Sequence, residues 1–268
     1  CHSCVNRSTY DCFNYLKKKF KNVPIIGFSA TPLRIGKTNG DHNESRLVNI
    51  FCDKNNDKKL ELLTNYNIIY SIERGWILPP TFYWFSYENE NKDKLTNKEL
   101  DIIMKSMNER AISMPNRKGV AWCGRISTAK KWFKKFNENK HKYSNLKDIE
   151  CYIDHSKSND CDDGYRKNVS YTAFRRKSKD AIIFCANKHR EGSDIPYLDF
   201  CIFLDKVKNR SSNTFIQCIG RVLRKSEGKT EGIIIDGYFQ SEGRLEAKHI
   251  SDKIIGYYLY LENIATDE

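Results

Sequence analysis

Three polar side chains recur on one side of residues 212–225 if this segment is helical. Gln217, Arg221 and Arg224 are spaced i, i+4 and i+7, and this spacing gathers side chains on one face of an α-helix. Gly220 leaves the strip uncrowded. A guanidinium group is always charged, and its paired donors match phosphate oxygens. The strip therefore predicts a phosphate-binding face, although a solvated basic face is the commoner meaning of such a helix taken alone.

Further polar segments follow apolar runs that are typical of buried strands. Open parallel sheets bind their ligands at the carboxyl ends of the strands, so these segments are candidate ligand contacts. They are Ser29–Thr31 after residues 25–28, Gly124–Ser127 after residues 120–123, and Ala186–Pro196 after residues 181–185.

Apolar runs alternate with segments of helical periodicity along most of the chain. This alternation predicts an α/β fold in which a parallel sheet is covered by helices on both faces. The predicted strands are residues 23–28, 82–85, 120–123, 149–153, 181–185, 200–204 and 232–235. The predicted helices are residues 7–21, 100–111, 126–136, 165–174, 212–225 and 244–261.

A domain boundary is predicted at Pro79-Pro80, because two successive prolines continue neither a helix nor a central strand. A chain of 268 residues with 39% hydrophobic residues suits two modest domains. We therefore expect a first domain over residues 1–78, a second over residues 79–242, and a packed terminal helix over residues 243–268.

The formal net charge of +12 indicates either a polyanionic partner such as nucleic acid or scattered solvated lysines, and charge alone weighs the two equally. The sequence contains no run of roughly 18 apolar residues, and its start does not resemble a signal peptide. Several of the ten cysteines lie inside apolar runs, where a small buried thiol fits. A soluble protein of a reducing, intracellular compartment is expected.

Two weak metal signals occur. Cys1 and Cys4, with Cys12 nearby, have the spacing of half a zinc site, but the sequence has no second Cys-x-x-Cys pair. Asp160, Asp162 and Asp163 are acidic neighbours without the EF-hand pattern, so a polar surface loop is the better interpretation. No metal site is predicted.

Taken together, these segments resemble the motifs of superfamily 2 helicases. Gln217–Arg224 resembles motif VI, Arg190–Pro196 motif V and Gly27–Pro32 motif III, in the order and at the separation found in that family. Ser71–Pro79 resembles the linker between the two motor domains, and His155-Ser156 the segment between motifs IV and V. The resemblance covers nearly the whole chain. It is strongest to a DExH-type, DNA-acting branch that includes excision-repair motors, type III restriction motors and helicases of large DNA viruses.

The resemblance implies a RecA-like fold of the P-loop NTPase type, with a first motor domain present from its middle onward. Cys1-His2 would end an Asp-Glu-Cys-His motif, which makes the Cys1-x-x-Cys4 spacing incidental. The two acids would precede Cys1, and no Gly-x-x-x-x-Gly-Lys-[Ser/Thr] loop occurs in the chain. We therefore expect this chain to have no significant ATPase activity by itself.

The family's roles can be carried over to matching positions. ATP and Mg²⁺ would lie between the two domains, and Arg221 and Arg224 would stabilise the γ-phosphate as arginine fingers do. The implied nucleotide contacts are Gly192, Asp194, Gln217, Gly220, Arg221 and Arg224, and the residues that couple ATP to movement are His2, Ser29, Ala30 and Thr31.

Nucleic acid, either DNA or RNA with DNA slightly favoured, would be held largely through its backbone. The candidate contacts are Arg125, Ser127, Ser156, Lys188 and Arg190. Arg125 has the alternative of a solvent-exposed helix start, and Lys188 and Arg190 that of pairing with Glu191 or Asp194. The function implied is an ATP-dependent helicase or translocase. The competing class is a catalytically dead binding module that keeps the fold.

Overall fold

The computed structural model describes residues 7–20, 68–87, 96–156, 167–186, 188–189, 193–207, 210–239 and 257. The chain divides into two compact units, Cys1–Asn67 with Asn263–Glu268, and Ile68–Glu262. In the first unit the structure describes α1 (Arg7–Lys19), which confirms the helix predicted there. The predicted strand at residues 23–28 lies outside the described residues, and the domain limits at residues 78 and 242 stay predictions.

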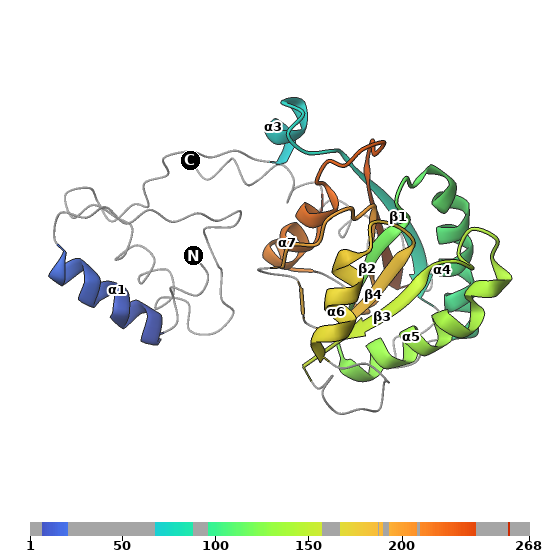
Figure 1. Ribbon diagram of the computed structural model, residues 1–268, viewed down its shortest axis with the longest axis horizontal. Helices are drawn as coiled ribbons and strands as arrows, with labels where there is room; N and C mark the ends of the chain where they lie inside the picture. The colour runs from blue at the N-terminus through green and yellow to red at the C-terminus, as the bar shows by residue number, and fades with distance from the viewer. Residues whose placement is uncertain are drawn as a thin grey trace. The chain divides into compact units, whose positions relative to one another are not determined.

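The second unit is built on a six-stranded parallel sheet (Figure 1). The strand order is β1-β6-β5-β2-β4-β3. All six predicted strands of this unit are present. Their bounds are β1 (Pro80–Tyr87), β2 (Lys118–Cys123), β3 (Glu150–Asp154), β4 (Ala181–Ala186), β5 (Phe200–Phe203) and β6 (Gly232–Phe239).

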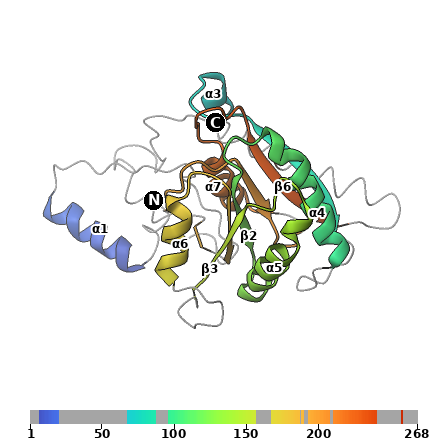
Figure 2. The same ribbon diagram turned by 45° about the vertical axis from the view of Figure 1, so that its right-hand side comes forward.

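Helices cover both faces of the sheet, as predicted (Figure 2). Phe136 of α5 packs against Phe184 of β4 on one face, whereas Phe174 of α6 packs against Tyr152 of β3 on the other. Strands covered on both faces are apolar throughout, which is why they form continuous apolar runs in the sequence. The helices are α4 (Asn97–Arg110) and α5 (Ile126–Asn139) on the first face, and α6 (Lys167–Arg176) and α7 (Ser212–Val222) on the second.

The start of α4 is fixed by a capping box. The Thr96 hydroxyl accepts a hydrogen bond from the backbone N–H of Glu99, and the Glu99 carboxylate accepts one from the backbone N–H of Thr96. The same carboxylate is fully buried and accepts from Lys206 Nζ at 2.7 Å. Glu99 therefore ties α4 to the segment that follows β5.

The helix predicted to continue to residue 225 ends at Val222. Lys229 Nζ donates to the carbonyl oxygens of Val222, Leu198 and Arg224, and so satisfies groups that the helix end leaves without a partner. Arg224 consequently lies beyond the helix. The prediction that Arg224 belongs to the helical strip with Gln217 and Arg221 was therefore wrong. Arg224 reaches the site from the turn after α7.

The double proline marks the entry to an edge strand. Pro80 begins β1, which is at one end of the strand order, in agreement with the expectation that these prolines would not lie in a central strand. The residues before it, which follow the short helix α3 (Ile68–Glu73), are bound to the sheet unit. Leu78 N donates to Leu223 O at 2.8 Å, and Gly232 N donates to Pro79 O at 2.9 Å.

The C-terminal helix predicted over residues 244–261 is described at one residue. Tyr257 is helical and 2% exposed, and its ring stacks on Phe215 of α7 with centroids 3.9 Å apart. The rest of that predicted helix lies outside the described residues.

We predict that Gly232→Ala destabilises the protein by about 1–3 kcal/mol. A Cβ at this position would lie 2.6 Å from Leu223 Cδ2 and 2.9 Å from the Val222 carbonyl oxygen, and a backbone atom cannot easily move away. Gly220→Ala is the control, because a Cβ there meets nothing within 4 Å and alanine is the better helix former. Urea unfolding measures both variants. A Gly232→Ala midpoint at or above the wild-type value would contradict this packing.

Candidate functional site

The carboxyl ends of neighbouring parallel strands carry most of the described candidate residues. Parallel pairing with Cys123 opposite Ala186, and Asp154 opposite Cys185, places the ends of β2, β3 and β4 at the same edge. The polar segments at this edge are Gly124-Arg125 after β2, His155-Ser156 after β3, Lys188-His189 after β4 and Asp205-Lys206 after β5.

Two arginines bind the loop that follows β4. Arg221 of α7 donates from Nη1 to the backbone carbonyl of Ser193. Arg224 donates from Nη1 to Oδ1 of Asp194 at 2.6 Å, and Arg175 of α6 lies 3.7 Å from the other carboxylate oxygen. The structure therefore brings together Asp194, Arg221 and Arg224, as the resemblance implies.

Electrostatics make this cluster receptive to an anion. Burial lowers the pKa of Arg221, and the positive charge of Arg224 lowers it further. Two guanidinium groups, those of Arg224 and Arg175, pair with the carboxylate of Asp194, which is 69% exposed. A phosphate beside Arg221 and Arg224 would offset their mutual repulsion and would match their paired donors.

The structure describes two of the remaining predicted nucleotide contacts and leaves one outside the described residues. Gln217 is a partly buried residue of α7, and Gly220 is an exposed one. The nucleotide contact Gly192, the nucleic-acid contact Arg190 and the coupling residues His2, Ser29, Ala30 and Thr31 lie outside the described residues, and their roles stay predictions.

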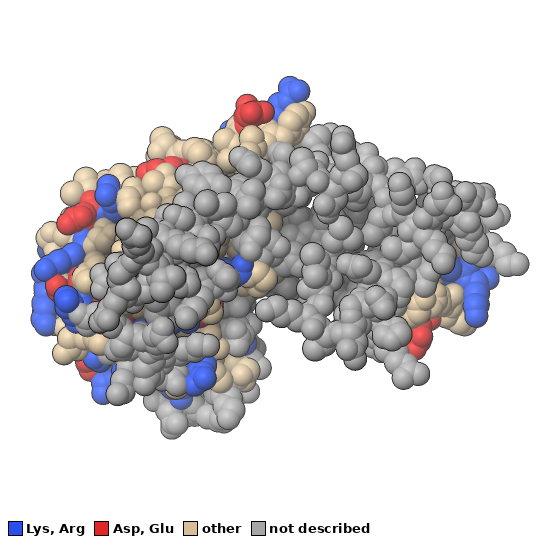
Figure 3. Space-filling model, turned by 180° about the vertical axis from the view of Figure 1, so that it is seen from behind, with Lys and Arg blue, Asp and Glu red and all other residues tan. Residues whose placement is uncertain are grey.

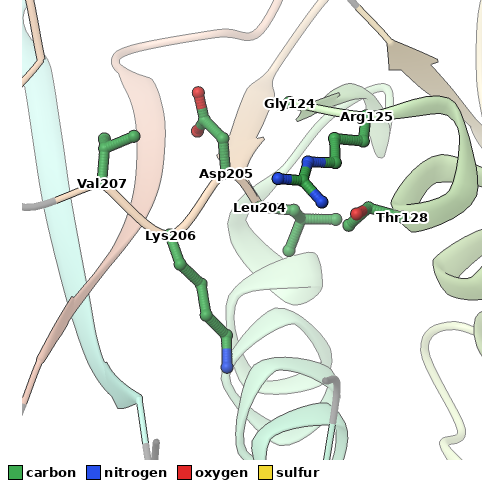
Figure 4. Close-up of a pocket in the computed structure, with 7 residues that line it drawn as sticks. All are labelled: Gly124, Arg125, Thr128, Leu204, Asp205, Lys206 and Val207. Carbon is green, nitrogen blue, oxygen red and sulfur yellow. The ribbon is translucent and has the colours of Figure 1, made fainter. Parts of the chain in front are cut away.

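A pocket of about 180 Å³ opens beside the start of α5 (Figure 4). The Arg125 side chain extends over it near Leu204 and Thr128, whereas Lys206 points away toward its buried partner Glu99. Asp205 also lines the pocket, but both of its carboxylate oxygens accept hydrogen bonds from Arg210 at 2.7 Å. Arg210 offsets part of this negative charge and also lies 3.6 Å from Asp236, so Arg125 is the candidate contact for an anionic ligand at the pocket.

Three of the other predicted nucleic-acid contacts, Ser127, Ser156 and Lys188, are described and follow strands of the same edge. Ser156 is exposed after β3, and Ser127 is an exposed residue in the first turn of α5. Lys188 pairs with Asp154 at 2.7 Å, which is neither of the partners expected for it. Glu191, one of those partners, lies outside the described residues. Asp154 itself was missed, although a carboxylate directly after the apolar run 149–153 was a usable signal.

The surplus positive charge is distributed over several places. Figure 3 shows separate groups of Lys and Arg with acidic groups among them on the face that it presents. Some lysines of α4 and α5 are paired with carboxylates one helical turn away, such as Lys105 with Asp101 at 2.8 Å. The net charge alone therefore does not locate the nucleic-acid contacts.

Among the described residues, no three His, Cys, Asp or Glu side chains are grouped so that they could hold a metal ion. No described helix is long and apolar enough to cross a membrane. Five of the six described cysteines are buried as free thiols within the sheet unit, and the sixth, Cys12, is exposed on α1.

Comparison with known families agrees with this geometry. Residues 99–226, a little under half of the chain, match the family model described as "Helicase conserved C-terminal domain". The matched segment runs from α4 to just beyond α7, so it includes Arg125, Asp194 and both arginines of the cluster. Together with the parallel sheet, the match identifies the fold as that of a RecA-like helicase C-terminal domain.

Three solved structures with a similar chain fold are the following. The C-terminal domain of the DEAD-box protein Dbp5 is 16% identical, with 68% of this chain and 85% of that chain covered and a TM-score of 0.42. S. cerevisiae Dbp5 bound to RNA and ADP BeF3 is 18% identical, with 75% and 42% covered and a TM-score of 0.45. Mycobacterium smegmatis helicase Lhr bound to ssDNA and AMP-PNP is 9% identical, with 68% and 22% covered and a TM-score of 0.45. No curated protein matches the chain.

We predict that Asp154 makes the protein sensitive to acid. Burial raises the pKa of its carboxyl group, but hydrogen bonds and charge from His189 and Lys188 lower it more, so that the net pKa is below the ordinary value. A depressed folded-state pKa gives stability that is present above the unfolded value of about 4 and is lost as the pH falls through the folded value. The stability difference between wild type and Asp154→Asn should therefore shrink on acidification below about pH 4. Urea unfolding at a series of pH values measures it, and a constant difference would contradict the assignment.

Proposed function

We propose that this chain supplies the second motor domain of an ATP-dependent nucleic-acid helicase or translocase. The observation that carries the proposal is the placement of Arg221 and Arg224 beside Ser193 and Asp194 at the carboxyl edge of a helicase-type domain. The residues match a family motif, and their geometry suits a phosphate. The parallel sheet is the usual support for such a site.

The proposed mechanism places ATP between this domain and a first motor domain. That domain would hold the phosphates through a Gly-Lys-[Ser/Thr] loop and Mg²⁺ through an Asp-Glu pair. The charge of Mg²⁺ would help to neutralise the phosphates. When the domains close, Arg224 would exchange its exposed partner Asp194 for the γ-phosphate, since both side chains of this ion pair are largely exposed, Arg224 to 49% and Asp194 to 69%. Arg221 would keep its Nη1 contact with the Ser193 carbonyl and present its remaining donors to the phosphate.

The remaining motif residues have supporting roles in this proposal. Gln217, Gly192 and Gly220 would adjoin the nucleotide. Residues Ser29, Ala30 and Thr31, with His2, would link its hydrolysis to movement, so their loss would uncouple the two steps. These assignments come from the resemblance of the sequence.

Nucleic acid would cross the edge that carries the pocket. Arg125 would contact a backbone phosphate there, with support from Ser127, Ser156, Lys188 and Arg190. Backbone contacts carry little sequence preference. DNA is slightly favoured over RNA by the branch that the motifs resemble, and a viral motor is one member of that branch. The reduced buried thiols fit an intracellular compartment.

The second candidate function is a binding module that keeps the helicase fold without turnover. The same arginines and the same pocket would then hold nucleotide and nucleic acid passively. Turnover separates the two candidates, because only the motor requires the transition state of phosphoryl transfer to be stabilised.

We predict that nucleic-acid-stimulated ATP hydrolysis by the full-length protein depends on Arg221. Arg221→Ala should lower kcat by about 10³-fold or more, because an arginine finger neutralises charge that develops in the transition state. Hydrolysis is measured with single-stranded DNA, with single-stranded RNA and without either. Arg110→Ala is the matched control, since this exposed arginine at the end of α4 packs on Tyr83 outside the cluster. Equal, unstimulated hydrolysis in wild type and Arg221→Ala would favour the binding module.

We also predict that Arg125→Ala weakens binding of single-stranded oligonucleotides by a similar factor whatever their sequence. Loss of one phosphate contact should reduce the slope of log K against log salt by about one. Lys105→Ala is the control, because Lys105 is an exposed cation of α4 paired with Asp101. Fluorescence anisotropy over a range of salt concentrations gives both quantities. An unchanged slope would show that Arg125 does not contact a backbone phosphate.

A further inference from the structure

A continuous chain of hydrogen bonds runs from the end of β3 into the loop that follows β4. Asp154 Oδ2 lies 2.6 Å from Nε2 of His189, and Nδ1 of His189 lies 2.8 Å from the hydroxyl of Ser193. The other oxygen of Asp154 accepts from Lys188 at 2.7 Å. Both ring nitrogens of His189 and both carboxylate oxygens of Asp154 are therefore engaged.

The direction of these hydrogen bonds follows from the groups. The Asp154 carboxylate accepts only, and its lowered pKa keeps it ionised. Nε2 of His189 therefore donates to Asp154, and in the neutral ring Nδ1 accepts from the Ser193 hydroxyl. A carboxylate behind a histidine fixes the tautomer and the orientation of the ring in this way.

The imidazole ring is also held by a stacked aromatic ring, and the backbone of His189 has an uncommon conformation. Tyr171 of α6 stacks on it with centroids 3.9 Å apart and an interplanar angle of 14°. The side chains of His189 and Asp154 are 10% and 3% exposed. His189 has a φ of +60°, in the left-handed region that histidine adopts uncommonly. Such a backbone persists where its surroundings determine it, and the hydrogen bonds and the stacked ring do so here.

Ser193 joins this chain to the arginine cluster. Its hydroxyl binds His189, whereas its carbonyl accepts from Arg221, and its neighbour Asp194 pairs with Arg224. A displacement of Ser193 would thus be felt by both arginines. Arg221 is 9% exposed and has little room to adjust independently.

We propose that Asp154, His189 and Ser193 form a positioning relay that sets the place of Arg221 for phosphoryl transfer. This inference rests on the proposed function. The three side chains are positioning residues, because they would act on the reaction through Arg221. The relay extends from a rigid strand end, through a clamped ring, to the residue that holds Arg221.

The relay predicts a specific kinetic pattern in the full-length protein. Ser193→Ala and His189→Ala should lower the kcat of stimulated ATP hydrolysis by roughly 10- to 100-fold, because small misplacements of a transition-state group have effects of this size. KM for ATP should stay within about twofold, since the effect is on the transition state. The control is Ser113→Ala, which removes an exposed serine hydroxyl bonded to the Arg110 carbonyl at 2.9 Å.

Two further variants separate positioning from general structural damage. In an Arg221→Ala background, Ser193→Ala should cause no additional loss, because the group that it positions is gone. His189→Asn should retain more activity than His189→Ala. Asparagine tolerates the left-handed backbone, and its amide oxygen can accept from Ser193. Additive losses, or equal activity of the two His189 variants, would overturn the relay.

A second measurement does not depend on turnover. In protein labelled with ¹⁵N-arginine, the side-chain Nε–H signal of Arg221 should shift in Ser193→Ala and His189→Ala and stay in place in Ser113→Ala. An unmoved Arg221 signal, or a shifted signal with wild-type kcat, overturns the inference. If wild type and Arg221→Ala hydrolyse ATP equally, the proposed function fails instead, while the signal of Arg221 still reports whether the relay exists.

Discussion

The parallel pairing of β2, β3 and β4 is the constraint on which the site depends. Its register sets Cys123 opposite Ala186 and Asp154 opposite Cys185, so three strands deliver their following residues to the same edge. A shift by one residue would turn the buried face of a strand toward the opposite helices, and strands buried on both faces resist it. The positions of Arg125, Asp154 and His189 are therefore consequences of backbone hydrogen bonds made well away from them.

Much of this fold could be predicted from the sequence because the sheet is covered on both sides. Ala121 packs toward α4 and α5 within one core cluster, while Trp122, the next residue, is fully buried on the opposite side. Such strands have no polar face and form unbroken apolar runs, which are easy to recognise. The strand order could not be predicted, since it depends on which runs pair. The end of α7 was predicted too far along, because Lys229 stops the helix through carbonyl contacts that no periodicity contains.

The parts of the candidate site that lie close together in the sequence could be predicted. The parts that strand pairing brings together from distant segments could not. Gln217 and Arg221 lie on one helix, so their spacing alone suggested a shared face. Asp154 and His189 are 35 residues apart, and their contact exists because β3 lies next to β4. A histidine in a polar loop gives no sign of a buried carboxylate partner. Likewise, the pocket beside Arg125 depends on Arg210 compensating Asp205, which becomes visible once the loop after β5 is placed.

The ammonium group of Lys229 has a consequence for how this domain opens. It binds three carbonyls at once, those of Leu198 before β5, Val222 at the end of α7 and Arg224 in the turn after it, and burial lowers the pKa of Lys229 to about 8. A buried cation that loses its acceptors is costly, so the helix end cannot fray while the strand entry stays closed. These two segments therefore belong to one cooperative unit. Thermal fluctuations would release two segments at the same time, the turn that carries Arg224 and the entry to β5. The backbone of Arg224 therefore keeps its place for as long as the sheet is intact.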